Sequence, residues 1–385
     1  MAPTVEPNAN LLFTELRVGK ILLRNRIIMA PMTRGRAAPD GMPLPRMATY
    51  YAQRASAGLL ITEAIIISPQ AGGWIQAPKI YTPEHVRAWR QVTDAVKARG
   101  GRIFAQLWFV GRVSHPDFID GRIPLAPSAL RANHHVHTPQ GKKECVTPQA
   151  MTLDDIRGVE REFADAARRA IEAGFDGVQI HAASGYLPDQ FLRDYTNRRT
   201  DAYGGPIANR LRFLRETVEG CARAVGPECV AVRLSTRNKY NDIDDRDPAA
   251  TFAAAAAALQ EYGLAFLDVM EPLPGHFIHV PGEPILPSMR AAFQGPLFTN
   301  GGYDRDTAEA VLAAGLADAV SFGVPYIGNP DLVERMAAGA ALNGSDPETF
   351  YVGEDRGYAD YPTMREGPSL LGEHRALSLG EASRH

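Results

Sequence analysis

The sequence predicts an α/β fold of the (β/α)8 TIM-barrel type, on three observations. Short apolar runs rich in β-branched residues occur eight times along the 385 residues. They are apolar on both faces, and most are followed by an amphipathic segment, as in a parallel sheet covered by helices. Eight such units favour a closed barrel over an open sheet, and the chain has no GxGxxG or P-loop spacing typical of the open alternative.

The eight apolar runs are predicted as the barrel strands, in the order Arg26–Met32, Gly58–Ile67, Arg102–Val110, Gly177–Ala182, Val230–Ser235, Phe266–Pro272, Pro296–Gly302 and Ala319–Val324. The clearest predicted helices between them are Pro83–Arg99, Thr152–Ala173, Pro206–Val225, Asp247–Tyr262 and Arg305–Ala314. Thr152 is a predicted N-cap because acidic residues follow it, and Gly174 and Gly315 stand where C-caps belong.

The chain is predicted to form a single TIM-barrel domain over residues 1–385, with the barrel at about 12–345. Residues 111–150 are rich in Pro, Gly and His and follow the third strand. Because such loops lie at the carboxyl end of a barrel, this stretch is predicted to form a capping subdomain. The tail, about 346–385, is aromatic at first and then polar, and its last twenty residues are expected to be loosely ordered.

Composition narrows the class of protein. A hydrophobic content of 45% with 22% charged residues is ordinary for a globular protein. The formal net charge of −3 gives no reason to expect a nucleic-acid or membrane partner. Three widely spaced cysteines without CxxC spacing argue against a disulfide framework. With no apolar leader and no long apolar stretch, the protein is predicted to be cytoplasmic.

Active sites of TIM barrels lie at the carboxyl ends of the strands, and phosphate is commonly held after strands seven and eight. That rule selects a set of candidate residues: Met32, Thr33, Ala64, Gln106, His181, Arg233, Asn300, Gly301, Gly302, Phe322 and Gly323.

The chemistry of these candidates suits a planar cofactor that carries a phosphate. Glycines let backbone N–H groups approach a phosphate closely, Gln106 offers an amide, and Arg233 offers a fixed cation. His181 and Tyr186 supply a hydrogen-bond donor and a phenolic acid. No carboxylate pair, Ser-His-Asp order or HExxH motif equips the site for hydrolysis. The histidines of NHHVH lack acid or cysteine partners at metal-ligand spacing, so no metal site is predicted.

Several motifs together resemble those of the old yellow enzyme family. They are NRIIMAPMTR, HAASGYLPDQFL followed by TNRRTDAYGGPIANRLRF, VRLS, FTNGGY and GYADYPT. The resemblance extends from about Leu12 to Thr363 in the same order and spacing. It implies an FMN-dependent flavoprotein oxidoreductase that reduces the C=C bond of α,β-unsaturated carbonyl compounds with NAD(P)H, an ene-reductase.

The resemblance also implies a role for each matching position. Pro31, Met32 and Thr33 would lie along the flavin ring edge, and Ala64 and Gln106 would hold its pyrimidine part. Arg233 would face the N1/O2 side, where negative charge accumulates on reduction. The phosphate would be held by backbone groups of Gly301, Gly302 and Gly323.

The substrate side of the site follows from the same motif. The resemblance implies that His181 donates to the substrate carbonyl oxygen and that Tyr186 delivers a proton to the α carbon. Tyr240 and Tyr351 are further candidates for the substrate pocket.

Three positions depart from the family pattern. Ser184 stands where asparagine is frequent, and its hydroxyl donates only one hydrogen bond. Val324 stands where an arginine usually grips the flavin phosphate. Phe109 replaces a common histidine and makes that wall apolar. Together these changes suggest an unusual substrate or weaker flavin binding, compatible with specialised metabolism.

Other interpretations stay open from the sequence alone. Arg233 could pair with a carboxylate inside the barrel, and Gly301–Gly302 could be only a tight turn. The same fold could catalyse a redox-neutral isomerisation or cyclisation with flavin structural or lost, or could merely bind a small molecule. The expected partner is a small enone or enal, and the expected oligomeric state is a monomer or homodimer.

Overall fold

A computed structural model describes residues 10–366 as a closed barrel of eight parallel strands, which confirms the predicted fold. Neighbouring strands follow the order β10–β11–β12–β13–β14–β3–β4–β5. In chain order they are β3 (Ile27–Met29), β4 (Leu59–Ile66), β5 (Ile103–Trp108), β10 (Gly177–Ala182), β11 (Val230–Ser235), β12 (Phe266–Met270), β13 (Leu297–Asn300) and β14 (Ala319–Phe322). All eight predicted runs become barrel strands.

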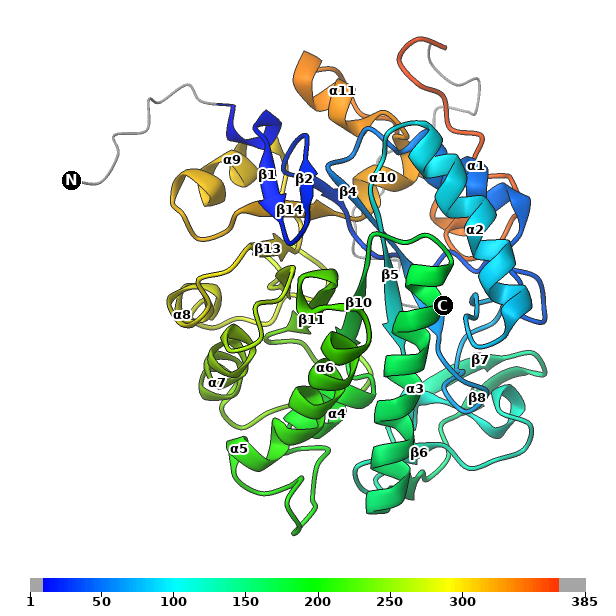
Figure 1. Cartoon of the computed structure of the whole chain (residues 1–385), viewed down its shortest axis with the longest axis vertical. Helices are drawn as coiled ribbons and strands as arrows, with labels where there is room; N and C mark the ends of the chain where they lie inside the picture. The colour runs from blue at the N-terminus through cyan, green and yellow to red at the C-terminus, as the bar shows by residue number, and fades with distance from the viewer. Residues whose placement is uncertain (1–9, 367–385) are drawn as a thin grey trace.

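Helices surround the barrel (Figure 1). They are α1 (Pro45–Gln53), α2 (Pro83–Ala98), α3 (Leu153–Glu172), α4 (Leu187–Leu192), α5 (Ile207–Arg210), α6 (Arg212–Val225), α7 (Pro248–Gln260), α8 (Leu286–Ala292), α9 (Arg305–Ala313), α10 (Val324–Gly328) and α11 (Leu332–Ala338). The predicted caps are present. Thr152 Oγ1 accepts from the N–H of Asp155 at 3.1 Å, and Gly174 and Gly315 have φ of +90° and +66°.

One predicted helix is wrong in its extent. The segment predicted as a single helix over Pro206–Val225 forms two, α5 and α6, which meet at Leu211. Arg210 at this junction is buried and pairs with Asp245, with Nη1–Oδ2 at 3.2 Å. This buried ion pair ties the short helix α5 to the loop after β11.

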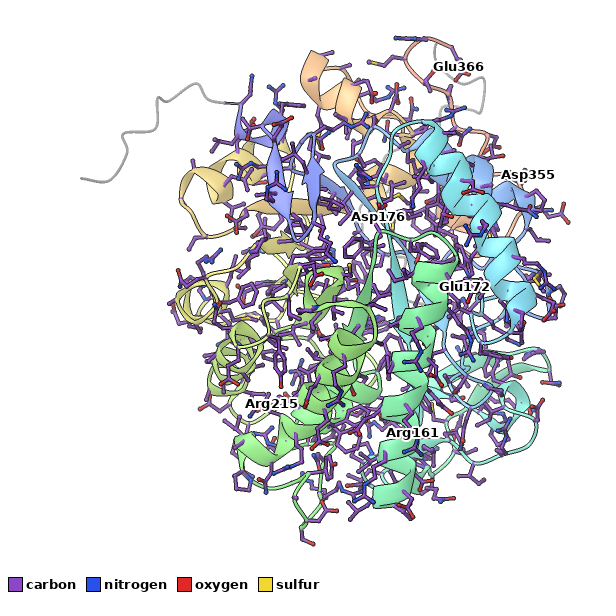
Figure 2. All side chains as sticks on the ribbon, viewed as in Figure 1. Arg161, Glu172, Asp176, Arg215, Asp355 and Glu366 are labelled. Carbon is purple, nitrogen blue, oxygen red and sulfur yellow. The ribbon has the colours of Figure 1, made fainter. Side chains whose placement is uncertain are left out.

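The amino end of the barrel is closed by apolar side chains. The hairpin of β1 (Leu16–Val18) and β2 (Ile21–Leu23) packs Val18 and Leu23 against it. Inside, the Phe266 and Phe298 rings stack with centroids 4.2 Å apart. Side chains cover the strands and helices throughout (Figure 2), and the apolar residues of this cluster are buried at this end of the barrel.

The insertion predicted at about 111–150 lies between β5 and α3. It contains two small sheets, β6 (Leu125–Ala126) with β9 (Gln149–Ala150), and β7 (His135–Thr138) with β8 (Gly141–Glu144). Arg112 of this insertion pairs with Asp242, which follows β11, with Nη2–Oδ2 at 3.3 Å. The insertion therefore contacts a loop at the carboxyl end of the barrel.

The described part of the tail folds back onto the loop after β3. Arg34 Nε donates to the carbonyl of Phe350 at 2.8 Å, and Arg36 Nη2 donates to that of Thr349 at 2.6 Å. Tyr358 stacks on Tyr50 of α1 with ring centroids 4.0 Å apart. The tail thus runs beside α1 (Figure 1) and brings residues near 350 to the barrel mouth.

Two expectations reach beyond this description. The loose order expected for the last twenty residues concerns a stretch that lies outside the described residues. None of the helices between residues 10 and 366 has the length and apolar character that crossing a membrane requires.

Candidate active site

Three barrel strands carry a phenylalanine followed two residues later by a polar side chain. Phe104 precedes Gln106 on β5, Phe266 precedes Asp268 on β12, and Phe298 precedes Asn300 on β13. Residues two apart on a strand face the same side of the sheet. The polar side chains therefore form a layer above the aromatic floor, toward the carboxyl end of the barrel.

This polar layer is joined by hydrogen bonds across the barrel. Gln106 Nε2 donates to Gln179 Oε1 at 2.8 Å, and Gln179 Nε2 donates to Asp268 Oδ2 at 3.0 Å. Arg233 Nη1 forms an ion pair with Asp268, and its Nη2 donates to Asn300 Oδ1 at 2.8 Å. The possibility that Arg233 pairs with a carboxylate is thus realised in the barrel. Neither Gln179 nor Asp268 could be singled out from the sequence, because both lie within apolar runs.

His181 lies two residues beyond Gln179 on β10, next to Arg233 in register. Its side chain is buried, and Nδ1 has no hydrogen-bond partner among the described residues. Burial and, secondarily, the charge of Arg233 lower the pKa of His181 to about 3. At neutral pH the ring is uncharged, and one of its nitrogens is a donor.

We expect the His181 ring to stay neutral across the range in which a free histidine titrates. Protonation would place a second cation beside Arg233 without water to solvate it, so charging begins only near pH 3. The measurement is the pH dependence of the ring ¹⁵N shifts in protein labelled at histidine, assigned with a His181→Gln variant. A midpoint between pH 5 and 8 would contradict the assigned environment.

Tyr186 follows a tight turn at the end of β10. Ser184 and Gly185 both have left-handed backbones, with φ of +58° and +78°. The turn sets the Tyr186 ring edge-on to His181, with centroids 4.8 Å apart, and to Trp108 at 4.9 Å. Burial, and then the nearby phenols of Tyr240 and Tyr351, raise the pKa of Tyr186. The phenol is therefore protonated at neutral pH and can act as an acid.

A buried ion pair that sequence reasoning missed supports this turn. Asp189 Oδ2 accepts from the N–H of Gly185 at 2.9 Å, and Asp189 Oδ1 accepts from Arg193 Nε at 2.8 Å. Arg193 Nη2 in turn donates to the carbonyl of Ser235 at 2.6 Å, tying the turn to β11. The available signal was the acid and base at i,i+4 in DQFLR, within the motif that follows His181.

The left-handed conformation makes a specific prediction for Ser184. Asparagine adopts positive φ more readily than serine does. We therefore expect Ser184→Asn to stabilise the fold by up to about 1 kcal/mol, measured as a higher urea midpoint at unchanged slope. Ser184→Ala serves as the control and should give no gain. An Asn variant less stable than the Ala variant would contradict the argument.

Four further predicted positions lie on the loop after β3 and on β4. Pro31, Met32 and Thr33 are partly exposed. Ala64 is buried and lies beside Gln106 in strand register. Gln106 gives one of its two amide N–H groups to Gln179, so its carbonyl oxygen and its second N–H are the groups that it can offer to a ligand. Ala64 and Gln106 are thus neighbours on β4 and β5, and Pro31, Met32 and Thr33 follow the adjacent strand β3.

The glycines after β13 form a bend that excludes side chains. Gly301 has φ of +140°, and a Cβ there would lie 2.6 Å from Pro272 Cα. Gly302 has φ of +94°, and a Cβ there would lie 3.2 Å from the His276 ring. A Cβ on Gly323 would meet only Met32, at 3.6 Å. Bare backbone at the ends of two adjacent strands suits a phosphate.

Two of the predicted cofactor residues support this bend with groups already engaged inside the protein. Asn300 Nδ2 donates to the carbonyl of Ser321 at 2.6 Å, in addition to the bond that Asn300 accepts from Arg233. Phe322 is buried, and its carbonyl accepts from the N–H of Ala30 at 2.9 Å. Both residues hold β13, β14 and β3 together beneath the glycines.

The departures from the family pattern have distinct surroundings. Val324 begins α10 directly after Gly323 and is 45% exposed, so it offers no charge where a cation would be accessible. Phe109 is buried in the main hydrophobic core.

The two tyrosines predicted for the substrate pocket each lie near another aromatic ring. Tyr351 is exposed beside Trp74, with ring centroids 5.3 Å apart, and the Tyr240 ring centroid lies 6.2 Å from that of His134.

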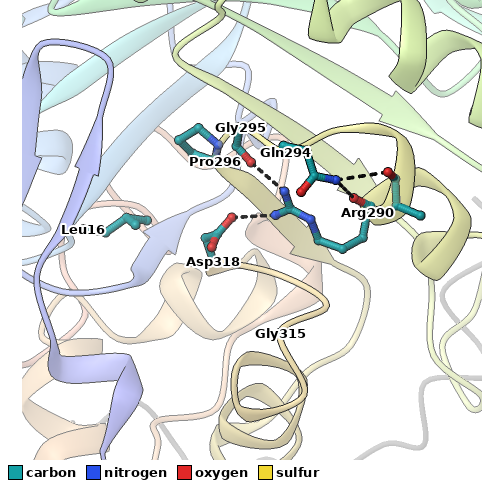
Figure 3. Close-up of a pocket in the computed structure, with 8 residues that line it drawn as sticks. Leu16, Arg290, Gln294, Gly295, Pro296, Gly315 and Asp318 are labelled. Atoms are coloured by element: carbon teal, nitrogen blue, oxygen red, sulfur yellow. Dashed lines mark hydrogen bonds and ion pairs between the residues drawn. The ribbon is translucent and has the colours of Figure 1, made fainter. Parts of the chain in front are cut away.

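A different cavity lies at the opposite end of the barrel (Figure 3). It measures about 590 Å³ and includes Arg290 and Asp318, which pair at 2.8 Å before the start of β14. None of the predicted site residues lines it. Across residues 10–366 there is also no cluster of His, Cys, Asp or Glu side chains able to hold a metal ion.

Comparison with known proteins agrees with this geometry. Residues 11–343 match the model of the NADH:flavin oxidoreductase / NADH oxidase family. A probable flavin mononucleotide-dependent alkene reductase of Leishmania infantum is 42% identical, over 91% of this chain and 96% of that protein. The old yellow enzyme homologue of Zymomonas mobilis is 45% identical with a TM-score of 0.90, over 91% and 99% of the two chains. Morphinone reductase in complex with tetrahydroNAD is 46% identical with a TM-score of 0.87, over 91% and 97%.

Proposed function

The chain belongs to the NADH:flavin oxidoreductase / NADH oxidase family, and from that premise we propose how its own residues reduce an alkene. It is an FMN-dependent oxidoreductase of the old yellow enzyme type, which reduces C=C bonds with NAD(P)H. We propose α,β-unsaturated aldehydes or ketones as the substrates. The roles given to individual residues are part of the proposal.

The residues at the barrel mouth fit FMN. Backbone groups of Gly301 and Gly302, where neighbouring atoms leave little room for a Cβ, and the backbone at Gly323 would hold the phosphate. Pro31, Met32, Thr33 and Ala64 would border the ring, Gln106 would hydrogen-bond to it, and Arg233 would stabilise negative charge on it. When bound, FMN supplies the two-electron transfer from NAD(P)H to the alkene.

His181 and Tyr186 would act on the substrate. A neutral imidazole N–H donates to the carbonyl oxygen and makes the β carbon more electron-poor. The phenol holds a proton that passes to the α carbon, which then carries the displaced electron pair. Ser184 would give a second, single donor near His181. Tyr240 and Tyr351 would form the pocket wall, together with Trp74 beside Tyr351.

The observation that carries this proposal is the contact between a neutral histidine and a protonated tyrosine. Their ring centroids lie 4.8 Å apart, and His181 Nδ1 is buried without a partner among the described residues. His181 lies beside Arg233 in strand register, and Tyr186 packs against Trp108. This arrangement places a hydrogen-bond donor for the carbonyl oxygen and a proton donor for the α carbon close enough to act on one substrate molecule. A redox-neutral isomerase would have no need of nicotinamide, and the reductases reported above do not favour that alternative.

The test is the stoichiometry of turnover. Protein reconstituted with FMN and given 2-cyclohexenone under anaerobic conditions should oxidise one NADPH for each saturated ketone formed. Product formation without NADPH loss would favour the isomerase, and absence of FMN uptake would overturn the proposal. The cytoplasmic location and the monomeric or homodimeric state stay predictions from the sequence.

A further inference from the structure

Asp268 is a buried acid that the proposed reaction does not use. It lies in the middle of β12 with no exposed surface, beside Arg233 in strand register. One of its oxygens, Oδ2, takes both the ion pair with Arg233 and the bond from Gln179. The other oxygen, Oδ1, is buried without a partner among residues 10–366.

The ion pair changes the electrostatic field that acts on a ligand bound above the polar layer. Arg233 alone would present a full positive charge in a region that excludes water, where charges act strongly. Asp268 adds a full negative charge in direct contact, and Gln179 keeps it in place. The pair is therefore nearly neutral at a distance, although the arginine N–H groups still offer hydrogen bonds.

We propose that Asp268 is a positioning residue that lowers the reduction potential of the bound flavin by offsetting the charge of Arg233. The inference rests on the proposed function, because it requires FMN above the polar layer. Reduction adds negative charge to the flavin, so a weaker positive field makes reduction less favourable. A flavin held at lower potential gives its electrons more readily to weakly activated alkenes.

The experiment measures the midpoint potential of FMN bound to the intact protein, by equilibration with redox dyes. In Asp268→Asn the side chain keeps its shape and loses its charge. We expect the ratio of reduced to oxidised flavin at a fixed potential to rise at least tenfold, which is about 30 mV for a two-electron couple. Asp318→Asn is the matched control, because it removes the same charge from the aspartate–arginine pair at the other barrel end (Figure 3).

A second variant is needed because Asp268→Asn leaves Arg233 buried without a counter-charge, which can prevent folding. Asn300→Asp places a second carboxylate on Nη2 of Arg233, at the loss of one bond to the carbonyl of Ser321. We expect the potential to fall in this variant, opposite in sign to Asp268→Asn. A shift that depended only on damaged packing would not change sign with the charge.

The outcomes separate this inference from the proposed function. A positive shift in Asp268→Asn with a negative shift in Asn300→Asp supports the inference if Asp318→Asn is unchanged; if Asp268→Asn does not fold, the negative shift in Asn300→Asp decides. Shifts of the same sign in the two variants refute the inference. If the wild-type protein binds FMN and reduces an enone but neither variant shifts the potential, the role of Asp268 is refuted and the function stands. If the wild-type protein takes up no FMN, both are refuted.

Discussion

Replacing Tyr186 by phenylalanine is expected to slow enone reduction by about 10²–10⁴-fold, the usual contribution of a positioned proton donor. The substitution removes only the hydroxyl. The ring contacts with His181 and Trp108 at 4.8 and 4.9 Å would persist, so the site keeps its shape. Electron transfer to the flavin from NADPH needs no proton from this phenol, and that half-reaction should keep its rate.

Stopped-flow absorbance separates the two half-reactions, with flavin bleaching by NADPH followed first and recovery with the enone second. The matched control is Tyr262→Phe, which removes a hydroxyl that accepts from Arg215 at 3.3 Å outside the barrel. It should change neither rate. Equal losses in both half-reactions of Tyr186→Phe would refute the proton-donor role and indicate a general disturbance of the site.

Introducing an arginine at position 324 is expected to tighten FMN binding by roughly ten- to over a hundredfold. A charge-assisted bond to phosphate contributes about 1.5–3 kcal/mol. Val324 follows Gly323 directly and is 45% exposed, so an arginine there has room to reach the glycine bend. The present chain would hold the phosphate through backbone groups alone and therefore more weakly.

The measurement is the dissociation constant of FMN, obtained from the quenching of its fluorescence as apoprotein is added. Leu22→Arg is a control of similar exposure, 44%, which adds the same charge at the amino end of the barrel. Riboflavin, which lacks the phosphate, should gain nothing from Val324→Arg. An equal gain for riboflavin, or no gain for FMN, would place the phosphate elsewhere.

The sequence was informative about the barrel because strand signals alternate with helix signals along most of the chain. Runs that are apolar on both faces indicate strands covered by helices, and eight such strands predict a closed barrel. The positional rule for strand ends then selected His181, Arg233, Gly301 and Gly302 as candidates, and the structure has each of them near or directly after the carboxyl end of a strand. These signals are local in the sequence, so they can be recognised without knowing which strands are neighbours.

The contacts that depend on strand neighbours could not be read in advance. Asp268 is the lone acid in the apolar run FLDVM, and nothing in that run indicates which residue pairs with it. Its pairing with Arg233 requires β11 and β12 to be adjacent in a register that places these two residues side by side. The same holds for Gln106 and Gln179, which come from neighbouring strands β5 and β10.

The tail was unpredictable for a related reason. Arg34 and Arg36 donate to backbone carbonyls of residues near 350, and every residue type has such a carbonyl. No sequence pattern therefore indicates which segment of chain supplies them. The outcome matters for the site, because this docking brings Tyr351 against Trp74 at the barrel mouth.

A crystal structure of the protein with FMN tests the central claim most directly, namely that flavin binds at the carboxyl end of this barrel. We predict electron density for the phosphate against the backbone at Gly301, Gly302 and Gly323, with the ring bordered by Thr33, Gln106 and Arg233. His181 and Tyr186 should face the open side of that ring. Electron density for FMN at any other place on the protein would contradict the account.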